Sequence, residues 1–176
     1  IVAGDQSGDS HAAKLMKELS LINPEITFIG IGGNEMTKAG LESIVPLSEI
    51  SVVGFWEVAK RYFYFKQLIK KCQQILLSRA IDCFIPVDYP GFNIRLATFA
   101  KKNKIPVYYF IAPQLWAWGK SRARKLASAV DKLFVVFPFE VEYFNKFGIK
   151  TTFVGHPLLD KEIFSQEFER ESRIAL

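Results

Sequence analysis

Cysteines and long apolar runs are scarce in this sequence, and each scarcity excludes a class of protein. Only two cysteines occur, Cys72 and Cys83, without the neighbours of a metal site or the spacing of a disulfide framework. We therefore expect a reducing compartment. No stretch of 18 or more apolar residues occurs, so the sequence predicts no membrane-spanning helix. The fingerprint GxGxxG is absent from the first glycine-rich turn, which argues against a nicotinamide enzyme.

The composition is that of a globular domain with a basic charge balance. Of 176 residues, 49% are hydrophobic and 23% charged, which excludes a disordered chain. The formal net charge is +5, with Lys and Arg concentrated at 60–71, 101–104 and 120–125. This balance favours an anionic partner, which can be a phosphorylated ligand, a nucleic acid or an acidic membrane surface.

Strand-like apolar runs alternate with helix-like segments along most of the chain. The alternation predicts an α/β fold, a Rossmann-like doubly wound domain with a mainly parallel sheet. We expect this domain over residues 1–158 and a charged linker over 159–176 that leads into a further domain. Both ends of the sequence resemble interrupted strands, so we expect a piece of a longer protein. The predicted strands lie at 1–3, 27–31, 43–45, 83–87, 107–111, 132–136 and 151–154, and the predicted helices at 8–21, 35–39, 54–78, 92–102, 121–129 and 139–147.

One acid stands where a buried strand ends. The apolar run 83–87 is followed by Asp88, and a new helical pattern begins at about Phe92. The carboxyl ends of strands border the ligand crevice of an α/β sheet, and a carboxylate is costly to bury unpaired. Asp88 is therefore a candidate site residue. The alternative is that Asp88 only caps the next helix.

Two glycine-rich turns follow the first two strands. The turn at 4–9 reads GDQSGD, and its glycines let the backbone approach a ligand. The alternative is an ordinary helix cap made by Ser7 or Asp9. For the second turn, GIGG at 30–33, tight packing is at least as good an explanation as ligand contact. The candidate ligand contacts in the first turn are Gly4, Asp5, Ser7 and Gly8.

The predicted helix 54–78 carries more aromatic residues than one buried face needs. Six lie within 55–65, interleaved with Lys and Arg, and Trp56, Phe63 and Tyr64 fall off the core-facing stripe. Such a helix is typical of contact with a membrane surface or an acyl chain. A helix packed on two sides and a subunit contact are the alternatives, and nucleic acid fits the charge but not the apolar surface. The candidate contacts are Phe55, Trp56, Tyr62, Phe63, Tyr64 and Phe65.

A loop rich in proline and tryptophan supplies a further candidate. Residues 112–119 read APQLWAWG and precede a basic stretch. Flat rings beside positive charge suit a sugar that carries a phosphate, which makes Pro113, Trp116 and Arg122 candidate substrate contacts. The alternative is a buried loop anchor, a role that suits Trp118.

The two histidines have different settings. His156 lies between a glycine and a proline at the end of the last strand, where it could form an acid/base pair with Asp88 if the fold brings them together. His11 lies early in the first helix without such a context, and we expect it to be an ordinary residue.

The motifs, taken together and in order, resemble those of the bacterial lipid-A-disaccharide synthases, which are glycosyltransferases of the GT-B type. The resemblance covers essentially the whole chain and implies the N-terminal half of a two-domain fold. The phosphate loop that opens the family's second domain has no counterpart here. The matching motifs are AGDQSGD at 3–9, GIGG at 30–33, VVGFWEV at 52–58, VDYPGFN at 87–93, APQLWAWGKSR at 112–122, FPFE at 137–140 and VGHPLLD at 154–160.

The resemblance also implies a reaction. The full enzyme would join a UDP-linked diacylglucosamine donor to a lipid monosaccharide phosphate acceptor through a β(1→6) bond, with inversion and release of UDP, and without a metal or other cofactor. Asp88 matches the family's proposed catalytic base, and Asn93 in the same motif is expected to contact substrate. Some members carry an acid where this chain has Gly91, so that position receives no role. Alone, this half is expected to be inactive, because the missing half would hold most of the UDP.

The resemblance further implies where the protein works. We expect a cytoplasmic location, peripheral on the inner face of the bacterial inner membrane, with surface lipids as partners and no nucleic acid. Whether the protein forms a homo-oligomer stays open. Two other functions remain as alternatives: a non-catalytic membrane-surface binding module, and a UDP-sugar epimerase of similar two-domain architecture, whose soluble substrates would not explain the aromatic helix.

Overall fold

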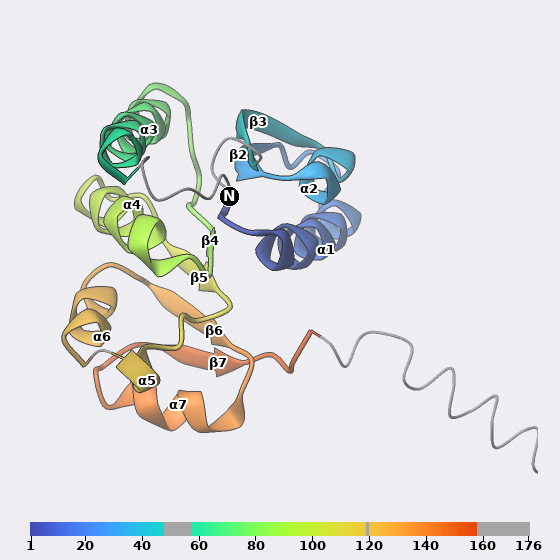
Figure 1. Ribbon diagram of the computed structural model, residues 1–176. Helices are drawn as coiled ribbons and strands as arrows, with labels where there is room; N and C mark the ends of the chain where they lie inside the picture. The colour runs from blue at the N-terminus through green and yellow to red at the C-terminus, as the bar shows by residue number, and fades with distance from the viewer. Residues whose placement is uncertain (48–57, 119, 158–176) are drawn as a thin grey trace, which may run out of the picture.

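Seven parallel strands form one sheet in the part of the chain that the computed structural model describes, residues 1–47, 58–118 and 120–157. Their order is β3-β2-β1-β4-β5-β6-β7, which confirms the Rossmann-like prediction (Figure 1). The order reverses between β1 and β4, and this switch point is where such sheets bind ligands. The strands are β1 Val2–Ala3, β2 Phe28–Gly32, β3 Leu41–Pro46, β4 Pro86–Val87, β5 Tyr108–Phe110, β6 Lys132–Val135 and β7 Thr151–Phe153.

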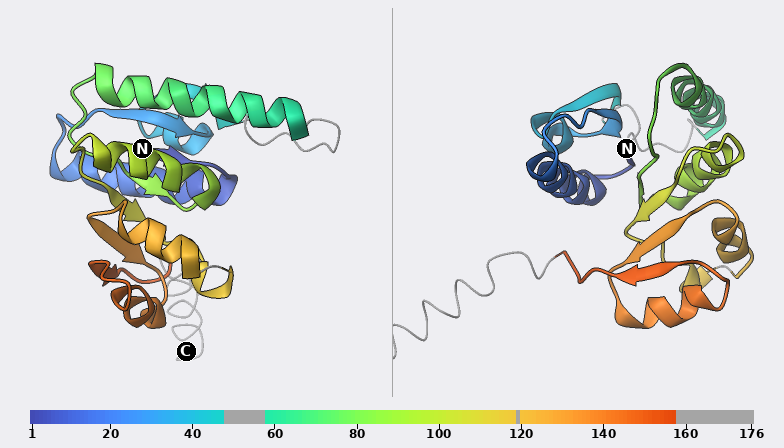
Figure 2. Two further views of the ribbon diagram at one scale, coloured as in Figure 1. Left: turned by 90° about the vertical axis from the view of Figure 1, so that its left-hand side faces the viewer. Right: turned by 180° about the vertical axis from the view of Figure 1, so that it is seen from behind.

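Helices cover the two faces of the sheet (Figure 2). On one face α1 (Gln6–Ile22) and α2 (Asn34–Lys38) bury a small cluster around Met16. A larger core lies on the other face, around Tyr109 and Leu133. Side chains of neighbouring strand residues point to opposite faces, so Val2 joins the larger core and Ala3 the smaller one. The helices that contribute to the larger core are α3 Val58–Ser78, α4 Pro90–Lys102, α5 Leu115–Trp118, α6 Lys120–Ala127 and α7 Pro138–Asn145.

The aromatic helix α3 has one clear buried stripe. Leu68, Cys72 and Leu76 are buried at spacings of four residues, and they pack toward α4. Phe65 continues the stripe, with its ring 6.1 Å from that of Phe92 in an edge-on contact. Burial of such side chains contributes roughly 1.5–3 kcal/mol each. The stripe explains how α3 is fixed to the domain.

The predicted elements all occur, with two informative differences. The Pro/Trp segment, expected to be a loop, contains a short helix α5, Leu115–Trp118. Strand β4 is shorter than predicted, because Pro86 has no N–H to donate, and only an isolated bridge from Phe84 to Val107 precedes it. Residues 54–57 of the predicted aromatic helix and the predicted linker 159–176 lie outside the described residues.

Candidate functional site

A cavity of about 220 Å³ lies where the carboxyl ends of the central strands meet. It brings together side chains from the turns after β1, β4, β5, β6 and β7, which are distant in sequence. Five of the predicted site residues line it: Asp5, Ser7, Gly8, Asp88 and His156. The other lining residues are His11, Ile111, Ala112, Gln114, Val136, Phe137, Glu140 and Pro157.

The backbone at Asp88 turns in a conformation that is unusual for residues with a side chain. Asp88 and Tyr89 have φ angles of 42° and 48°, both in the left-handed region. The Asp88 carbonyl accepts hydrogen bonds from the Tyr109 hydroxyl at 2.6 Å and from Asn93 Nδ2 at 2.8 Å. Asn93 Nδ2 also lies 3.2 Å from the Val2 carbonyl oxygen and 3.1 Å from that of Val87. Asn93 is fully buried, so it positions Asp88 and does not line the cavity.

The Asp88 carboxyl group does not cap α4. That helix begins at Pro90 after Tyr89, and no side chain makes a cap hydrogen bond there. Burial, and to a smaller extent the nearby charge of Asp5, raise the pKa of Asp88 to about 6, although a hydrogen bond from the Tyr89 backbone opposes the rise. A carboxyl group with this pKa is mostly ionised at neutral pH and can accept a proton, as a general base must.

The acids of the first turn have separate structural tasks. The cap of α1 is Asp5, whose Oδ1 accepts from the Gly8 N–H at 2.7 Å, so the alternative cap at Ser7 or Asp9 is wrong. Asp9 is buried and points to α2. Its carboxylate accepts from the backbone N–H groups of Gly33 at 2.7 Å, Glu35 at 3.0 Å and Met36 at 3.1 Å.

Close packing requires glycine at two positions of these turns. A Cβ on Gly4 would lie 2.1 Å from the Tyr89 ring, and one on Gly33 would lie 2.6 Å from Asp9 Oδ2. Neither residue lines the cavity. The GIGG turn is therefore explained by tight packing between α1 and α2.

Both histidines of the chain line the same cavity, although 145 positions separate His11 from His156. The His11 Nε2 atom lies 3.3 Å from the Ser7 hydroxyl oxygen. The His156 ring lies against Phe137, with centroids 5.3 Å apart. We expected no special role for His11, and its place in the cavity wall makes it a further candidate site residue. Its spacing of four residues from Ser7 was the available signal, because such residues share a helix face.

Glu140 is a further residue that the sequence did not single out. Its side chain is only 1% exposed, and its carboxylate accepts from Trp116 Nε1 at 3.2 Å and from the Phe137 N–H at 3.1 Å. Burial raises the pKa of Glu140, and these hydrogen bonds oppose the rise. The indole of Trp116 is thus held beside the cavity, edge-on to Phe139, without lining it. Of the other loop candidates, Pro113 is buried and Arg122 is exposed on α6.

The charges around the cavity suit a neutral polar group better than an anion. Asp5, Asp88 and Glu140 line it together with two imidazoles, and no Lys or Arg is among the lining residues. Hydroxyl groups can donate to carboxylates and accept from imidazoles, as the hydroxyls of a sugar do. Within the described ranges, no cluster of three or more His, Cys, Asp or Glu side chains could hold a metal ion.

In the described part of the aromatic helix, one aromatic side chain is largely exposed to solvent. Phe63 is 65% exposed, whereas Tyr64 and Phe65 are half-buried and pack against the core. Phe55 and Trp56 lie outside the described residues, as do the side chains of Tyr62 and Trp118.

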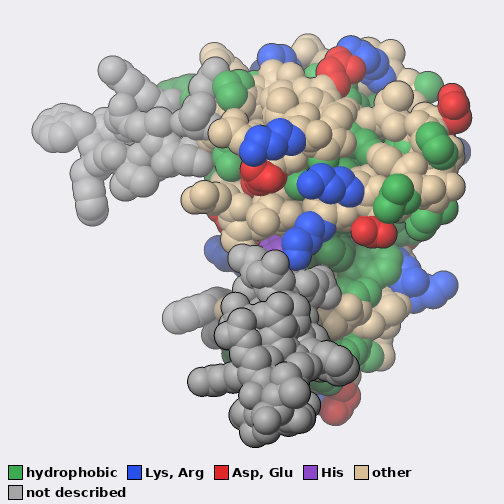
Figure 3. All heavy atoms as spheres, turned by 90° about the vertical axis from the view of Figure 1, so that its right-hand side faces the viewer, with side chains coloured by type: hydrophobic (Ala, Val, Ile, Leu, Met, Phe, Trp, Pro, Cys, Tyr) green, Lys and Arg blue, Asp and Glu red, His purple; other side chains and the backbone are tan. Residues whose placement is uncertain are grey.

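In the ranges that are described, no helix has both the length and the apolar content needed to cross a membrane. On the face shown in Figure 3, basic and acidic side chains are interspersed and form no single-sign patch.

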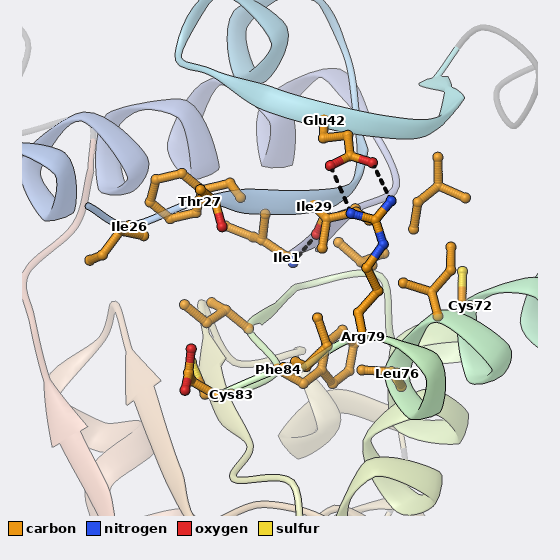
Figure 4. Close-up of a pocket in the computed structure, with 18 of the residues that line it drawn as sticks. Ile1, Ile26, Thr27, Ile29, Glu42, Cys72, Leu76, Arg79, Cys83 and Phe84 are labelled. Carbon is orange, nitrogen blue, oxygen red and sulfur yellow. Dashed lines mark hydrogen bonds and ion pairs between the residues drawn. The ribbon is translucent and has the colours of Figure 1, made fainter. Parts of the chain in front are cut away.

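A second cavity, of about 500 Å³, lies at the opposite edge of the sheet, near the amino ends of the strands (Figure 4). Its lining is mostly apolar and includes an ion pair between Arg79 and Glu42, with Nη2 and Oε1 2.8 Å apart. Burial raises the pKa of the Cys72 thiol in its wall to about 11, so this thiol is a poor nucleophile. Glu42 and Asp82 are the acids in this wall, and no histidine is among its lining residues.

The strand order and its switch point define a Rossmann-like α/β domain, with a polar cavity at the carboxyl ends of its strands. Comparison with known proteins assigns it further. The sequence profile of the family described as lipid-A-disaccharide synthetase matches residues 1–176, and the chain belongs to this family.

Curated relatives agree with the family assignment. The chain is 42% identical to the lipid-A-disaccharide synthase of Geobacter metallireducens over 92% of its length and 42% of the relative's length. It is 39% identical to lipid-A-disaccharide synthase 1 of Legionella pneumophila strain Lens over 100% of its length and 46% of the relative's. The corresponding protein of Persephonella marina is 42% identical over 91% and 42%. The chain thus spans less than half the length of these relatives.

Proposed function

We propose that the full-length protein is a lipid-A-disaccharide synthase and that this chain is its acceptor-binding half. The single observation that carries the proposal is Asp88, a partly buried carboxylate with a pKa of about 6, at the switch point of a sheet that belongs to this family. The substrates are a UDP-linked diacylglucosamine donor and a diacylglucosamine 1-phosphate acceptor. The product is the β(1→6) disaccharide, and UDP is released.

In the proposed reaction Asp88 acts as the general base. Its carboxylate accepts the proton of the acceptor's 6-hydroxyl as that oxygen attacks the anomeric carbon of the donor. The bond from this carbon to UDP breaks on the opposite side, which inverts the configuration. A base with a pKa near 6 is mostly ionised at pH 7 and retains some proton affinity. The hydroxyl is deprotonated only as the new bond forms, so a carboxylate is basic enough.

The division of labour between the two halves is part of the proposal. Residues 1–158 would bind the acceptor, and 159–176 would connect them to a donor-binding domain that holds most of the UDP. The relatives are more than twice as long as their match to this chain, which supports a second domain. The cavity has no lining Lys or Arg, which supports placing the diphosphate elsewhere. This half alone would therefore be inactive.

The location of the protein is proposed from the substrates and from α3. Both substrates carry acyl chains, and the exposed Phe63 lies near Lys66, Lys70 and Lys71 on that helix. Basic side chains near anionic lipid contribute on the order of 1 kcal/mol each. We therefore place the protein in the cytoplasm, peripheral on the inner face of the inner membrane.

The decisive test is Asp88→Asn in the full-length protein. The variant keeps the size of the side chain but cannot accept the proton, so disaccharide formation should fall by a factor on the order of 10² to 10⁴ while the fold persists. Release of UDP and formation of disaccharide would be followed together by mass spectrometry. Near-normal turnover would remove Asp88 as the base, and an inactive wild-type protein would refute the proposed reaction.

The exposure of Phe63 also favours a second candidate, a non-catalytic membrane-surface module. Flotation with anionic liposomes separates the two, using a variant with both Trp56 and Phe63 changed to Ser. A module of this kind predicts loss of flotation in the variant and no glycosyl transfer by the wild type. Unchanged flotation of the variant would exclude this part of the chain as the anchor.

A further inference from the structure

Four aromatic rings form a continuous row that begins in the cavity wall and ends at the protein surface. Phe137 and His156 line the cavity, with ring centroids 5.3 Å apart. The Phe137 ring is stacked on that of Phe139, with centroids 5.6 Å apart, and Phe139 in turn meets Trp116 edge-on at 5.3 Å. Phe139 and Trp116 do not line the cavity, so this aromatic row leads outward from it.

The outer two rings of the row are exposed and yet held in place. Phe139 is 52% exposed and Trp116 is 42% exposed, so both offer apolar surface to a ligand. The Trp116 indole donates to the buried Glu140 carboxylate, which also accepts from the Phe137 N–H. One acid thereby ties the outer end of the row to the cavity wall. Rings that are already ordered lose less entropy when a ligand covers them.

The cavity and the aromatic row differ in polarity. Asp5, Asp88 and Glu140 line the cavity, together with no Lys or Arg, and carboxylates accept hydrogen bonds from hydroxyl groups. The outer two rings bear only one polar atom, the indole Nε1, and it donates to Glu140. A molecule that fits both parts has a neutral, hydroxyl-bearing ring with an apolar chain attached to it. A sugar without such a chain would leave the outer rings uncovered.

The aromatic row is separate from the surface of α3 that carries Phe63. The row belongs to α5 and to the start of α7, and α4 and α6 lie between these elements and α3 (Figures 1 and 2). Contacts join α3 to α4 and α4 to α6. The row is therefore no continuation of the proposed membrane contact, and the cavity is the site that it adjoins.

We propose that the exposed rings of Phe139 and Trp116 bind an acyl chain of the acceptor while its sugar ring occupies the cavity beside Asp88. The proposal rests on the proposed function, because it assumes that the cavity receives the acceptor. The ligand chemistry is a hydrocarbon chain, and the contact uses the faces of the rings and no polar atom. The aromatic row would then select acceptors that carry long acyl chains.

The test measures transfer by the full-length protein to acceptors with short and with long acyl chains, presented in the same detergent micelles. Phe139→Ser removes an exposed ring, so kcat/KM for the long-chain acceptor should fall about 5- to 10-fold, a loss in keeping with one partly covered ring. For the short-chain acceptor it should stay within about 2-fold of wild type, because a short chain does not reach the ring. Phe139→Leu restores apolar surface and should recover most of the loss, whereas a sugar stacked on the ring would need its aromatic face.

Trp116→Gln tests the outer end of the aromatic row. The amide of glutamine can still donate to Glu140 while the apolar face is lost, so the preference for long chains should fall as it does in Phe139→Ser. Leu21→Ser is the matched control, at an exposed apolar position about 20 Å along the axis of α1 from Ser7 in the cavity wall. It should leave kcat/KM for both acceptors unchanged. Thermal unfolding of each variant checks the fold, and if Phe139→Ser unfolds, Trp116→Gln against the control decides.

Equal losses for short- and long-chain acceptors would overturn the assignment and place the rings against the sugar or against another part of the protein. Control-like kinetics would also overturn it, as would a chain-length effect confined to the donor. Control-like kinetics in micelles together with lost flotation on liposomes would assign the rings to a membrane surface instead. A wild-type protein that forms no disaccharide would refute the proposed function itself, so the two failures are distinguishable.

Discussion

The Tyr109 hydroxyl donates a 2.6 Å hydrogen bond to the backbone carbonyl of Asp88 and thereby links β5 to the turn that presents the proposed base. Tyr109 is fully buried, so its hydroxyl has no competing water. Asp88 and Tyr89 are both left-handed, a conformation that costs about 1–2 kcal/mol for each residue with a side chain. The hydrogen bonds from Tyr109 and Asn93 to one carbonyl offset part of that cost.

Tyr109→Phe tests this link, because it removes one oxygen and keeps the buried ring. We expect a destabilisation of about 1 kcal/mol and a fall in kcat with little change in acceptor KM, since the base is misplaced while the cavity persists. Tyr108→Phe is the control, because Tyr108 precedes it on the strand and is 39% exposed. Equal kcat values for the two variants would show that the hydrogen bond does not position Asp88.

The raised pKa of Asp88 predicts a specific pH dependence. Between pH 3.8 and about 6, the folded protein still holds a proton on Asp88, whereas the unfolded chain has released it. The free energy of unfolding therefore falls as pH rises through this window. Asp88→Asn should therefore be more stable than wild type at pH 8, by about 1–2 kcal/mol after allowance for screening at the cavity, and equally stable near pH 3.5. Urea unfolding at the two pH values measures the difference. In the wild type, kcat/KM should decline on the acid side with an apparent pKa near 6.

Asp131 provides a comparison of the opposite sign. Its side chain accepts from the Lys101 ammonium group and, at 2.9 Å, from the Val107 N–H, and the Lys101 hydrogen bond lowers the pKa of Asp131. A lowered pKa in the folded state contributes stability that is present at neutral pH and lost as pH falls through the folded pKa. Asp131→Asn should thus be less stable than wild type at pH 8. If both variants are less stable than wild type there, the burial argument for Asp88 fails.

The sequence located the site because strand ends can be recognised, whereas the supporting contacts are long-range. Asp88 and His156 follow apolar runs, and the carboxyl ends of parallel strands share one edge of the sheet, so both were predicted to lie at that edge. Whether they line one cavity depends on the strand order, which the sequence left open. His11 and Glu140 lie in helices, where the side that faces a cavity depends on how the helix packs. Tyr109 reaches Asp88 through a hydrogen bond across 21 positions, and no local pattern encodes such a contact.

Asp9 is predicted to matter for stability and not directly for the chemistry. Asp9→Ala would leave the N–H groups of Gly33, Glu35 and Met36 without their acceptor in a largely buried setting. We expect a loss of about 2–4 kcal/mol in the free energy of unfolding. Asp82→Ala, which removes an exposed acid, should change it by no more than about 0.5 kcal/mol. A comparably small effect at Asp9 would mean that water replaces the carboxylate.

Gly4 and Gly91 make a matched pair, because both lie next to the Asp88 turn but in different surroundings. A Cβ on Gly4 would overlap the Tyr89 ring at 2.1 Å, whereas a Cβ on Gly91 would meet nothing within 4 Å. Gly4→Ala should therefore cost about 1–3 kcal/mol and displace the turn that carries Asp88. Gly91→Ala, in the first turn of α4, should be neutral or stabilising by about 0.5–1 kcal/mol, because alanine favours the helix. Urea unfolding gives the free energy of unfolding of both variants, and disaccharide formation is measured in parallel in the full-length protein. If Gly4→Ala matched Gly91→Ala in both measurements, the packing argument would be contradicted.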